Sequence, residues 1–165
     1  MGETTLCRER LIKYCTGVGL DIGFGGDSIA AGAITLDLGD FRARWPYQNI
    51  LGDARNLKWF KDFSLDYVYS SHCLEDFEDT ALILKEWFRV IKHGGFLVLF
   101  GPDQKVYEES CTQRKVQPNL GHKIKDFGLN YIKGILEEHF KDQYRIVHEI
   151  PLINGYSFDL VAEKL

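Results

Sequence analysis

The stretch GLDIGFGGDSI, residues 19–29, decides the fold of this chain. It opens with the pattern of a short buried strand, and Gly23, Gly25 and Gly26 follow at once. Glycine permits the tight turn that joins a strand to a helix, and it lets a ligand approach the main chain closely. A helix start also presents free N–H groups to a polar or anionic group. The stretch therefore predicts a strand, a glycine turn and a very short helix, with or without a ligand.

Strand patterns alternate with helical patterns along the rest of the chain, which is typical of a parallel sheet with helices on its faces. Helices are expected at residues 4–15, 84–91 and 129–140, and His93-Gly94-Gly95 is expected to cap the second. The expected strands are residues 19–22, 33–38, 49–51, 65–70, 96–100, 145–150 and 156–162. Because the turn at Asn154-Gly155 is so short, the last two strands must form an antiparallel hairpin.

Residues 101–127 differ from the rest of the chain. They are polar, carry two prolines and lack a helical or strand pattern. A connection this long is uncommon in a compact chain unless it has a function. We expect an irregular cover over an active site, within a single domain of residues 1–165.

Composition excludes several classes of protein. The formal net charge of -4 and the pI of about 5.7 disfavour a nucleic-acid partner. The four cysteines include no C-x-x-C pair, so neither a disulfide framework nor a metal site is expected. The start of the chain lacks the apolar core of a signal peptide, and the longest apolar run, Phe96 to Phe100, is too short to cross a membrane. A cytoplasmic protein is expected.

Two acids stand where parallel strands end. Asp37 closes the second expected strand, and its carboxylate could accept hydrogen bonds from both hydroxyls of a ribose. Asp53 follows the third strand, where it could meet the amino group of an adenine. NAD is disfavoured for two reasons. Ser28 replaces the third glycine of the dinucleotide motif, and Asp37 follows the glycines at a shorter distance than the acidic residue of that motif does. The residues thus favour an adenosine-containing ligand other than NAD.

Five runs, in this order, resemble successive motifs of the class I S-adenosylmethionine-dependent methyltransferases, most closely the small bacterial type-11-like group. They are LDIGFGG, AITLDLGD, GDARNL, LDYVYSSHCLEDF and EWFRVIKHGGFLVLFGPD, between residues 17 and 103. The resemblance implies a doubly wound, Rossmann-like α/β fold with a mostly parallel seven-stranded sheet. It implies the order 3-2-1-4-5-7-6, with strand seven antiparallel, and methyl transfer from S-adenosyl-L-methionine to a small-molecule acceptor.

The resemblance also assigns roles to single residues. Asp21 would orient the methionine amino group, directly or through water, and Asp37 would hold the ribose hydroxyls. The other cofactor contacts that it implies are Gly23 and Gly25 at the methionine and ribose, Asp53 and Ala54 at the adenine, and Ser71 in the methionine pocket. Histidine is the natural base for an oxygen or nitrogen acceptor, and His72 and His122 are the two candidates.

Two departures from the family pattern keep an alternative open. The helix after the glycine turn must be very short, and Asp76 stands where relatives usually carry histidine in LEHF. The alternative is a weak or inactive cofactor-binding subunit of the same fold. The motif Asn/Asp-Pro-Pro-aromatic of nucleic-acid amino-methyltransferases is absent after residues 65–70, which again favours a small acceptor. The oligomeric state stays open between a monomer and a homodimer.

Overall fold

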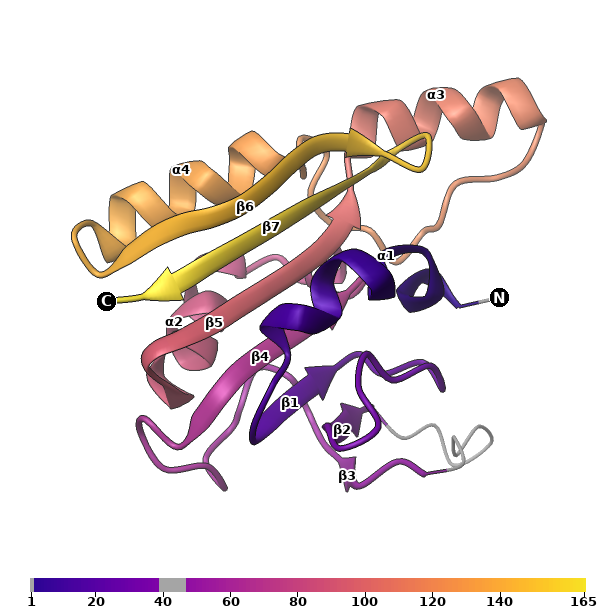
Figure 1. Cartoon of the computed structure of the whole chain (residues 1–165). Coiled ribbons are helices and arrows are strands. Elements are labelled where there is room, and N and C mark those ends of the chain that lie inside the picture. Colours follow the sequence, from indigo (N-terminus) through magenta and orange to yellow (C-terminus); the bar gives the residue numbers. More distant parts are fainter. Residues whose placement is uncertain (1, 39–46) are drawn as a thin grey trace.

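The computed structural model describes residues 2–38 and 47–165, which contain one seven-stranded sheet of order β3-β2-β1-β4-β5-β7-β6 (Figure 1). The strands are β1 (Gly19–Ile22), β2 (Ile34–Asp37), β3 (Ile50–Leu51), β4 (Leu65–Ser71), β5 (Ile91–Pro102), β6 (Tyr144–Ile153) and β7 (Ser157–Lys164). The first five are parallel, and β7 is antiparallel to both of its neighbours. The expected fold class, strand order and antiparallel strand are confirmed.

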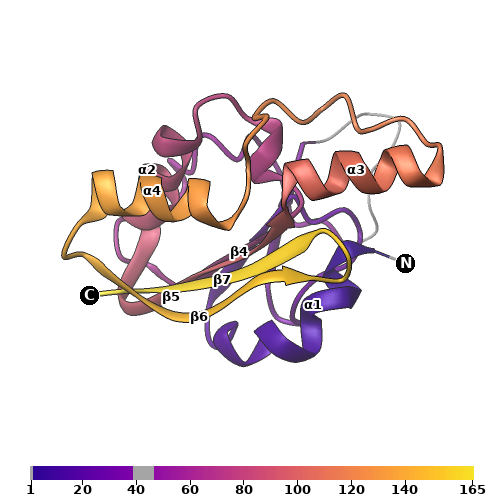
Figure 2. The same cartoon turned by 90° about the horizontal axis from the view of Figure 1, so that it is seen from above.

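Helices cover both faces of this sheet, as Figure 2 shows. They are α1 (Glu3–Leu11), α2 (Thr80–Val90), α3 (Gln104–Arg114) and α4 (Leu129–Phe140), with 3₁₀ turns η1 (Ile12–Tyr14) and η2 (Leu74–Asp76). Helices α2 and α4 lie on one face and α1 lies on the other. None of the helices in the described part of the chain is long and apolar enough to span a membrane.

Alternation along the strands divides the core into two layers. Successive side chains of a strand point to opposite faces of the sheet. Leu20 and Ile22 therefore pack with Trp87 on the α2 and α4 side. Tyr67 and Tyr69 point the other way and pack under α1. Asp21, between the two apolar residues of β1, is consequently buried on the α1 side, at 1% exposure.

The expected helix after the glycine turn does not form, and the prediction was wrong. Residues 23–33, all of which the structure describes, contain turns and no helix. The connection is instead tied to its surroundings. The carboxylate of Asp21 accepts a hydrogen bond from Ile29 N at 2.8 Å, Ile29 is fully buried, and Arg8 of α1 donates to Ser28 O at 2.9 Å. Buried side-chain contacts thus replace the helix.

The predicted cap at His93-Gly94-Gly95 was also wrong. Helix α2 ends at Val90 and β5 begins at the next residue, because Ile91 already pairs with Leu65 of β4. Gly94 does have a positive φ, +77°, as the predicted helix cap would require. It serves an irregularity in the pairing of β4 with β5.

The segment 101–127 is less irregular than expected, since it contains α3. The side chain of Asp103 caps this helix by accepting a hydrogen bond from Val106 N at 3.2 Å. Only Gln104 and Cys111 of the helix are buried, so its sequence has no apolar stripe. The polar composition that suggested a loop therefore belongs to a mostly exposed helix followed by a connection to α4.

Gly134 in α4 allows a test of the helix itself. It is exposed, and an added Cβ would have no atom within 4 Å. Because glycine in a helix is less favourable than alanine, Gly134→Ala should raise the free energy of unfolding by about 0.5–1 kcal/mol, measured by urea denaturation. Gly94→Ala is the matched control: its Cβ is equally free, but its φ of +77° makes the same change destabilising. A loss of stability in Gly134→Ala would contradict the helix.

Candidate functional site

The glycine turn lies against the carboxyl end of β2. Gly23 and Gly25 have positive φ angles of +70° and +54°. Gly23 N donates to Leu36 O at 3.0 Å, and Gly25 N donates to a carboxylate oxygen of Asp37 at 2.9 Å. The structure therefore brings Asp37, half-buried at the end of its strand, beside the main chain of the turn.

The two glycines have different neighbours. A Cβ on Gly23 would lie 2.5 Å from the Cβ of Cys73, so the segment after β4 packs directly on this residue. A Cβ on Gly25 would meet only the carbonyl oxygen of Gly23, at 3.7 Å, and Gly25 is exposed. Gly23 thus joins the turn to the end of β4, while Gly25 leaves the main chain open to a ligand.

Asp53 and Ala54 follow β3, whose end is held beside Asp37 by the bond from Gly52 N to Asp37 O at 3.0 Å. The carboxylate of Asp53 is paired with Arg55, whose Nη2 lies 2.5 Å away, and this pairing lowers the pKa of Asp53. An adenine amino group would share this carboxylate with Arg55. Ala54 is buried, and its carbonyl accepts a hydrogen bond from Trp87 Nε1 at 2.8 Å.

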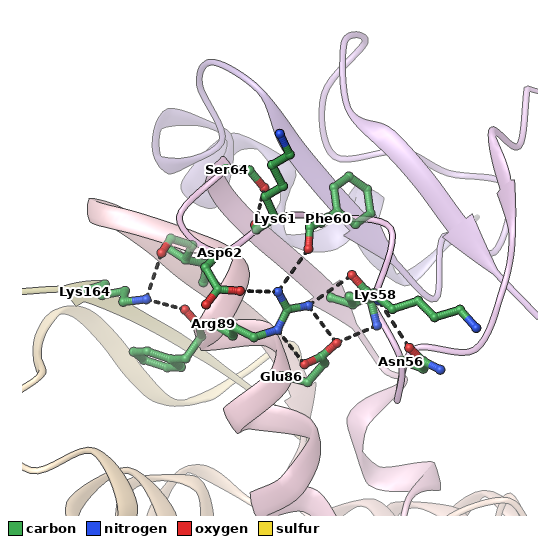
Figure 3. A network of polar contacts seen from close by, with 12 residues as sticks. Asn56, Lys58, Phe60, Lys61, Asp62, Ser64, Glu86, Arg89 and Lys164 are labelled. Atoms are coloured by element: carbon green, nitrogen blue, oxygen red, sulfur yellow. Dashed lines mark hydrogen bonds and ion pairs between the residues drawn. The ribbon is translucent and has the colours of Figure 1, made fainter.

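A polar network fastens the chain beyond Ala54 to α2 (Figure 3). Arg89 donates to both carboxylate oxygens of Glu86 and to Asp62. It also donates to the carbonyls of Leu57 and Phe60, at 3.1 and 3.0 Å. Glu86 accepts from Leu57 N at 2.8 Å. Sequence reasoning missed this network, which fastens residues 57–62, directly after the turn that carries Asp53 and Ala54, to α2.

Ser71 and Asp21 lie at the other side of the turn. Ser71 ends β4, is 7% exposed, and its hydroxyl oxygen has no hydrogen-bond partner among the described residues. Burial raises the pKa of Asp21 to about 7, and its bond to Ile29 N uses one carboxylate oxygen on the turn. A role for either residue at the methionine group stays a prediction.

His72 follows β4 directly and has a left-handed φ of +46°. Its Nε2 lies 3.3 Å from the hydroxyl of Ser157, and its Nδ1 lies 3.7 Å from Glu75 Oε1. Burial lowers the pKa of His72 to about 4, so the imidazole is neutral at neutral pH. The unusual backbone and the buried ring fix this histidine at the end of the sheet.

His122 reaches the same place from the segment between α3 and α4. Its Nδ1 lies 2.7 Å from Gln104 Oε1, and its Nε2 lies 3.7 Å from Glu75 Oε1. Burial lowers the pKa of His122 too. Lys123 N donates to Glu75 O at 2.8 Å, which ties this segment to η2. The two histidines selected from sequence, 50 residues apart, therefore face one carboxyl group.

That carboxyl group, Glu75, was not predicted. It is 1% exposed, and neither of its carboxylate oxygens has a hydrogen-bond partner among the described residues. Burial raises its pKa to about 8. It lines a cavity of about 10 Å³ together with His72, Phe127 and Phe158. In residues 2–38 and 47–165, no group of three or more His, Cys, Asp or Glu residues is placed to hold a metal ion.

Comparison with known proteins agrees with this architecture. Residues 28–99 match a family model described as a methyltransferase domain. A malonyl-[acyl-carrier protein] O-methyltransferase of Xylella fastidiosa (strain M23) is 32% identical in an alignment of 84 residues that covers 48% of this chain. The chain spans only 28% of the length of this curated relative.

Solved structures share the fold over nearly the whole chain. The PH0226 protein of Pyrococcus horikoshii OT3 superposes with a TM-score of 0.74 at 19% identity, covering 98% of this chain and 89% of its own. A SAM-dependent methyltransferase of Archaeoglobus fulgidus gives 0.72 at 20% identity, covering 99% and 95%. The chain is therefore similar to a methyltransferase domain over residues 28–99, and it shares its strand order and its antiparallel β7 with a Rossmann-like methyltransferase fold.

Proposed function

We propose that this chain binds S-adenosyl-L-methionine across the carboxyl ends of β1, β2 and β3 and transfers its methyl group to a small-molecule acceptor. The observation that carries the proposal is the Asp37 carboxylate at 2.9 Å from Gly25 N, in a glycine turn at the carboxyl ends of parallel strands. Ligands of open α/β sheets bind at such an edge. The hydroxyl of Ser71, which has no partner within residues 2–38 and 47–165, and the open main chain at Gly25 fit a polar ligand there.

Different residues would contact different parts of the cofactor. Asp37 would accept hydrogen bonds from the ribose hydroxyls, while Gly23 and Gly25 admit the ribose and methionine portions. Asp53 and the main chain of Ala54 would contact the adenine. The remaining contacts, at the methionine group, would come from Ser71 and Asp21.

When bound, the sulfonium group supplies an activated methyl. Alignment of the acceptor with this methyl accounts for most of the acceleration, an effect worth up to about 7–11 kcal/mol in favourable cases. Burial lowers the pKa of both histidines, so both imidazoles are neutral at neutral pH and have a lone pair for a proton from the acceptor. The pKa of about 4 makes His72 a weak base, which favours His122 for this role. A buried pair of neutral imidazoles beside a carboxyl group supports turnover rather than the inactive subunit, although Asp76 stands in the position where relatives carry histidine.

Calorimetric titration tests the proposal with S-adenosylmethionine, S-adenosylhomocysteine and NAD as ligands. We expect the first two to bind and to raise the melting temperature, because a ligand that binds only the native state stabilises it. NAD should do neither. Binding of NAD alone, or of none of the three, would remove the basis of the proposal. Cofactor binding without labelled product in any cell extract would favour the inactive subunit.

The proposal also covers where the protein acts in the cell and which class of molecule accepts the methyl group. A cytoplasmic location agrees with the four cysteines, all of which are free. A small acceptor rather than nucleic acid agrees with the net charge of -4. Cell fractionation and a filter-binding assay with DNA and RNA check these two statements.

A further inference from the structure

We propose that the methyl acceptor is an amine, whose ammonium group docks against the carboxylate of Glu75 between His72 and His122. This inference rests on the proposed function and names the acceptor class for the same site. It begins with a buried acid that the fold leaves without a partner. Both carboxylate oxygens of Glu75 lack hydrogen bonds among the described residues, although the side chain is 1% exposed. A buried polar group without a partner is costly, so a ligand that supplies donors is favoured there.

The space beside Glu75 suits a small head group. The cavity that Glu75 lines has a volume of about 10 Å³, close to the smallest that accepts one water molecule. An ammonium group is about as large as a water molecule and brings up to three donors. Rings of Phe100, Phe127 and Phe158 are among the apolar groups that line this cavity. The cavity has room for the ammonium group alone, so a carbon chain attached to the nitrogen would lie outside it.

Charge around the cavity selects against acids. Glu3 of α1 adds a second carboxylate, whose Oε2 has no hydrogen-bond partner among the described residues and lies 3.8 Å from His72 Nε2. Within the described part of the chain, no Lys or Arg forms an ion pair with Glu75 or Glu3. Once Glu75 is ionised, a carboxylate acceptor would bring a like charge to this site, whereas an ammonium group brings the opposite charge and favours that ionised form.

A hydrogen bond to Gln104 fixes which ring nitrogen of His122 can act as the base. Gln104 donates its Nε2 hydrogen to Glu108 at 2.9 Å, so its Oε1 is the atom that faces His122. An amide oxygen only accepts, and the proton of His122 must therefore sit on Nδ1. The Nε2 of His122 is left with its lone pair, 3.7 Å from Glu75 Oε1. A proton acceptor thus stands beside the acid that would hold the ammonium group.

The reaction balances with the groups named. The ammonium nitrogen gives one proton to Nε2 of His122, and its freed lone pair forms a bond to the methyl carbon. The bond between that carbon and sulfur breaks, and its electron pair stays on sulfur. The products are a methylated ammonium ion and S-adenosylhomocysteine with a neutral thioether. The imidazolium of His122 returns its proton to solvent.

Three probes of equal chain length test the acceptor class in the presence of S-adenosylhomocysteine: butylammonium, butanol and butyrate. Butylammonium should shift the NMR signals of the His72 and His122 imidazoles and bind at least tenfold more tightly than the other two. Equal or tighter binding of butanol or butyrate, or no binding of butylammonium, would overturn the inference. Loss of S-adenosylhomocysteine binding would instead defeat the proposed function, so the two failures are distinguishable.

Glu75→Gln is the central variant, because it keeps the size of the side chain and removes its charge. It should weaken butylammonium binding at least tenfold and leave the affinity for S-adenosylhomocysteine unchanged, which shows that the site is still folded. Glu78→Gln is the matched control, since Glu78 is exposed three residues further on. Equal butylammonium affinity in wild type and Glu75→Gln would overturn the inference.

The pH dependence gives a second readout. The carboxyl of Glu75 must ionise to hold a cation, and the groups that face it are His72, His122, Glu3 and Asp76. Because burial raises the pKa of Glu75 to about 8, butylammonium affinity should rise about tenfold per pH unit from pH 6 and level off above pH 8. The profile of Glu75→Gln should be flat. A wild-type profile that is flat or falls over this range would contradict the assignment.

Product chemistry completes the test. Cell extract is incubated with the protein and methyl-labelled S-adenosylmethionine. Unreacted cofactor, which is itself a cation, is removed by adsorption on charcoal, and the remaining products are passed over a cation exchanger and compared with extract incubated without the protein. Label should be retained on the exchanger and should survive mild alkali, as an N-methyl group does. Label that passes through and is released by alkali as methanol is a methyl ester and would identify a carboxylate acceptor, which overturns the inference while the proposed function stands.

Discussion

Asp37→Ala should reduce the affinity for S-adenosylmethionine about 100-fold or more and abolish the rise in melting temperature that the cofactor causes. Hydrogen bonds to a charged group contribute about 1.5–3 kcal/mol each, and the Asp37 carboxylate is proposed to accept two of them from the ribose. Each 1.4 kcal/mol corresponds to about a factor of ten in affinity. The variant also removes the acceptor for Gly25 N, which loosens the glycine turn itself. Calorimetry and thermal denaturation, each with and without cofactor, measure the two effects.

Asp37→Asn separates binding from the shape of the turn. The asparagine oxygen can still accept from Gly25 N, so the free energy of unfolding without cofactor should stay near that of wild type. Its affinity for the cofactor should fall between those of wild type and Asp37→Ala, because the charge is lost. Wild-type affinity in both variants would discard the assignment of the ribose to Asp37.

Trp87→Ala should lower the free energy of unfolding by about 3–5 kcal/mol, the range for large buried aromatic side chains. Trp87 is fully buried in the core on the α2 side of the sheet. Its Nε1 also donates to Ala54 O at 2.8 Å, so the variant leaves a carbonyl in the buried Ala54 without its donor. Urea denaturation measures the loss, and cofactor titration of the folded variant should show weaker binding because Ala54 is displaced.

Two further variants define the source of this loss. Trp87→Phe keeps most of the ring and removes the donor, so it should cost about 1–3 kcal/mol. Leu82→Ala on the same helix should change stability by less than about 0.5 kcal/mol, because Leu82 is 62% exposed. A cost of Trp87→Ala no larger than that of Leu82→Ala would contradict the placement of α2 against the sheet.

Much of the fold followed from local patterns. The apolar run of Phe96 to Phe100 predicted a strand, and β5 contains it and lies between β4 and β7. Asn154 and Gly155 predicted the final hairpin, and both have the positive φ angles that such a tight turn requires, +53° and +91°. In these places, neighbouring residues alone determine the backbone.

Long-range contacts explain where the prediction failed. Ile29 and Asp21 replace a helix between β1 and β2 through burial under α1, which no local pattern reports. Helix α3 lacks an apolar stripe because it is largely exposed. Its cap at Asp103 was the one local signal that could have revealed it.

The candidate site likewise contains some residues that the sequence located and others that only the folded chain reveals. The placement of Asp37 beside the glycine turn follows from a general rule on strand ends, so its sequence position was enough. No general rule of this kind points to Glu75. The family pattern pointed to its neighbour Asp76 instead. The isolation of the Glu75 carboxyl depends on α1, the 119–123 segment and the end of β4, which meet only in the folded chain.

The position of β7 has a consequence for how the protein is made. In the sheet, β6 pairs with β7 alone, and β7 also completes the edge of β5. During synthesis, β6 therefore leaves the ribosome with no strand to pair with until the residues of β7 follow. A nascent chain stalled before Ser157 would leave the edge of β5 unpaired, and this interval is when a chaperone would have most to bind.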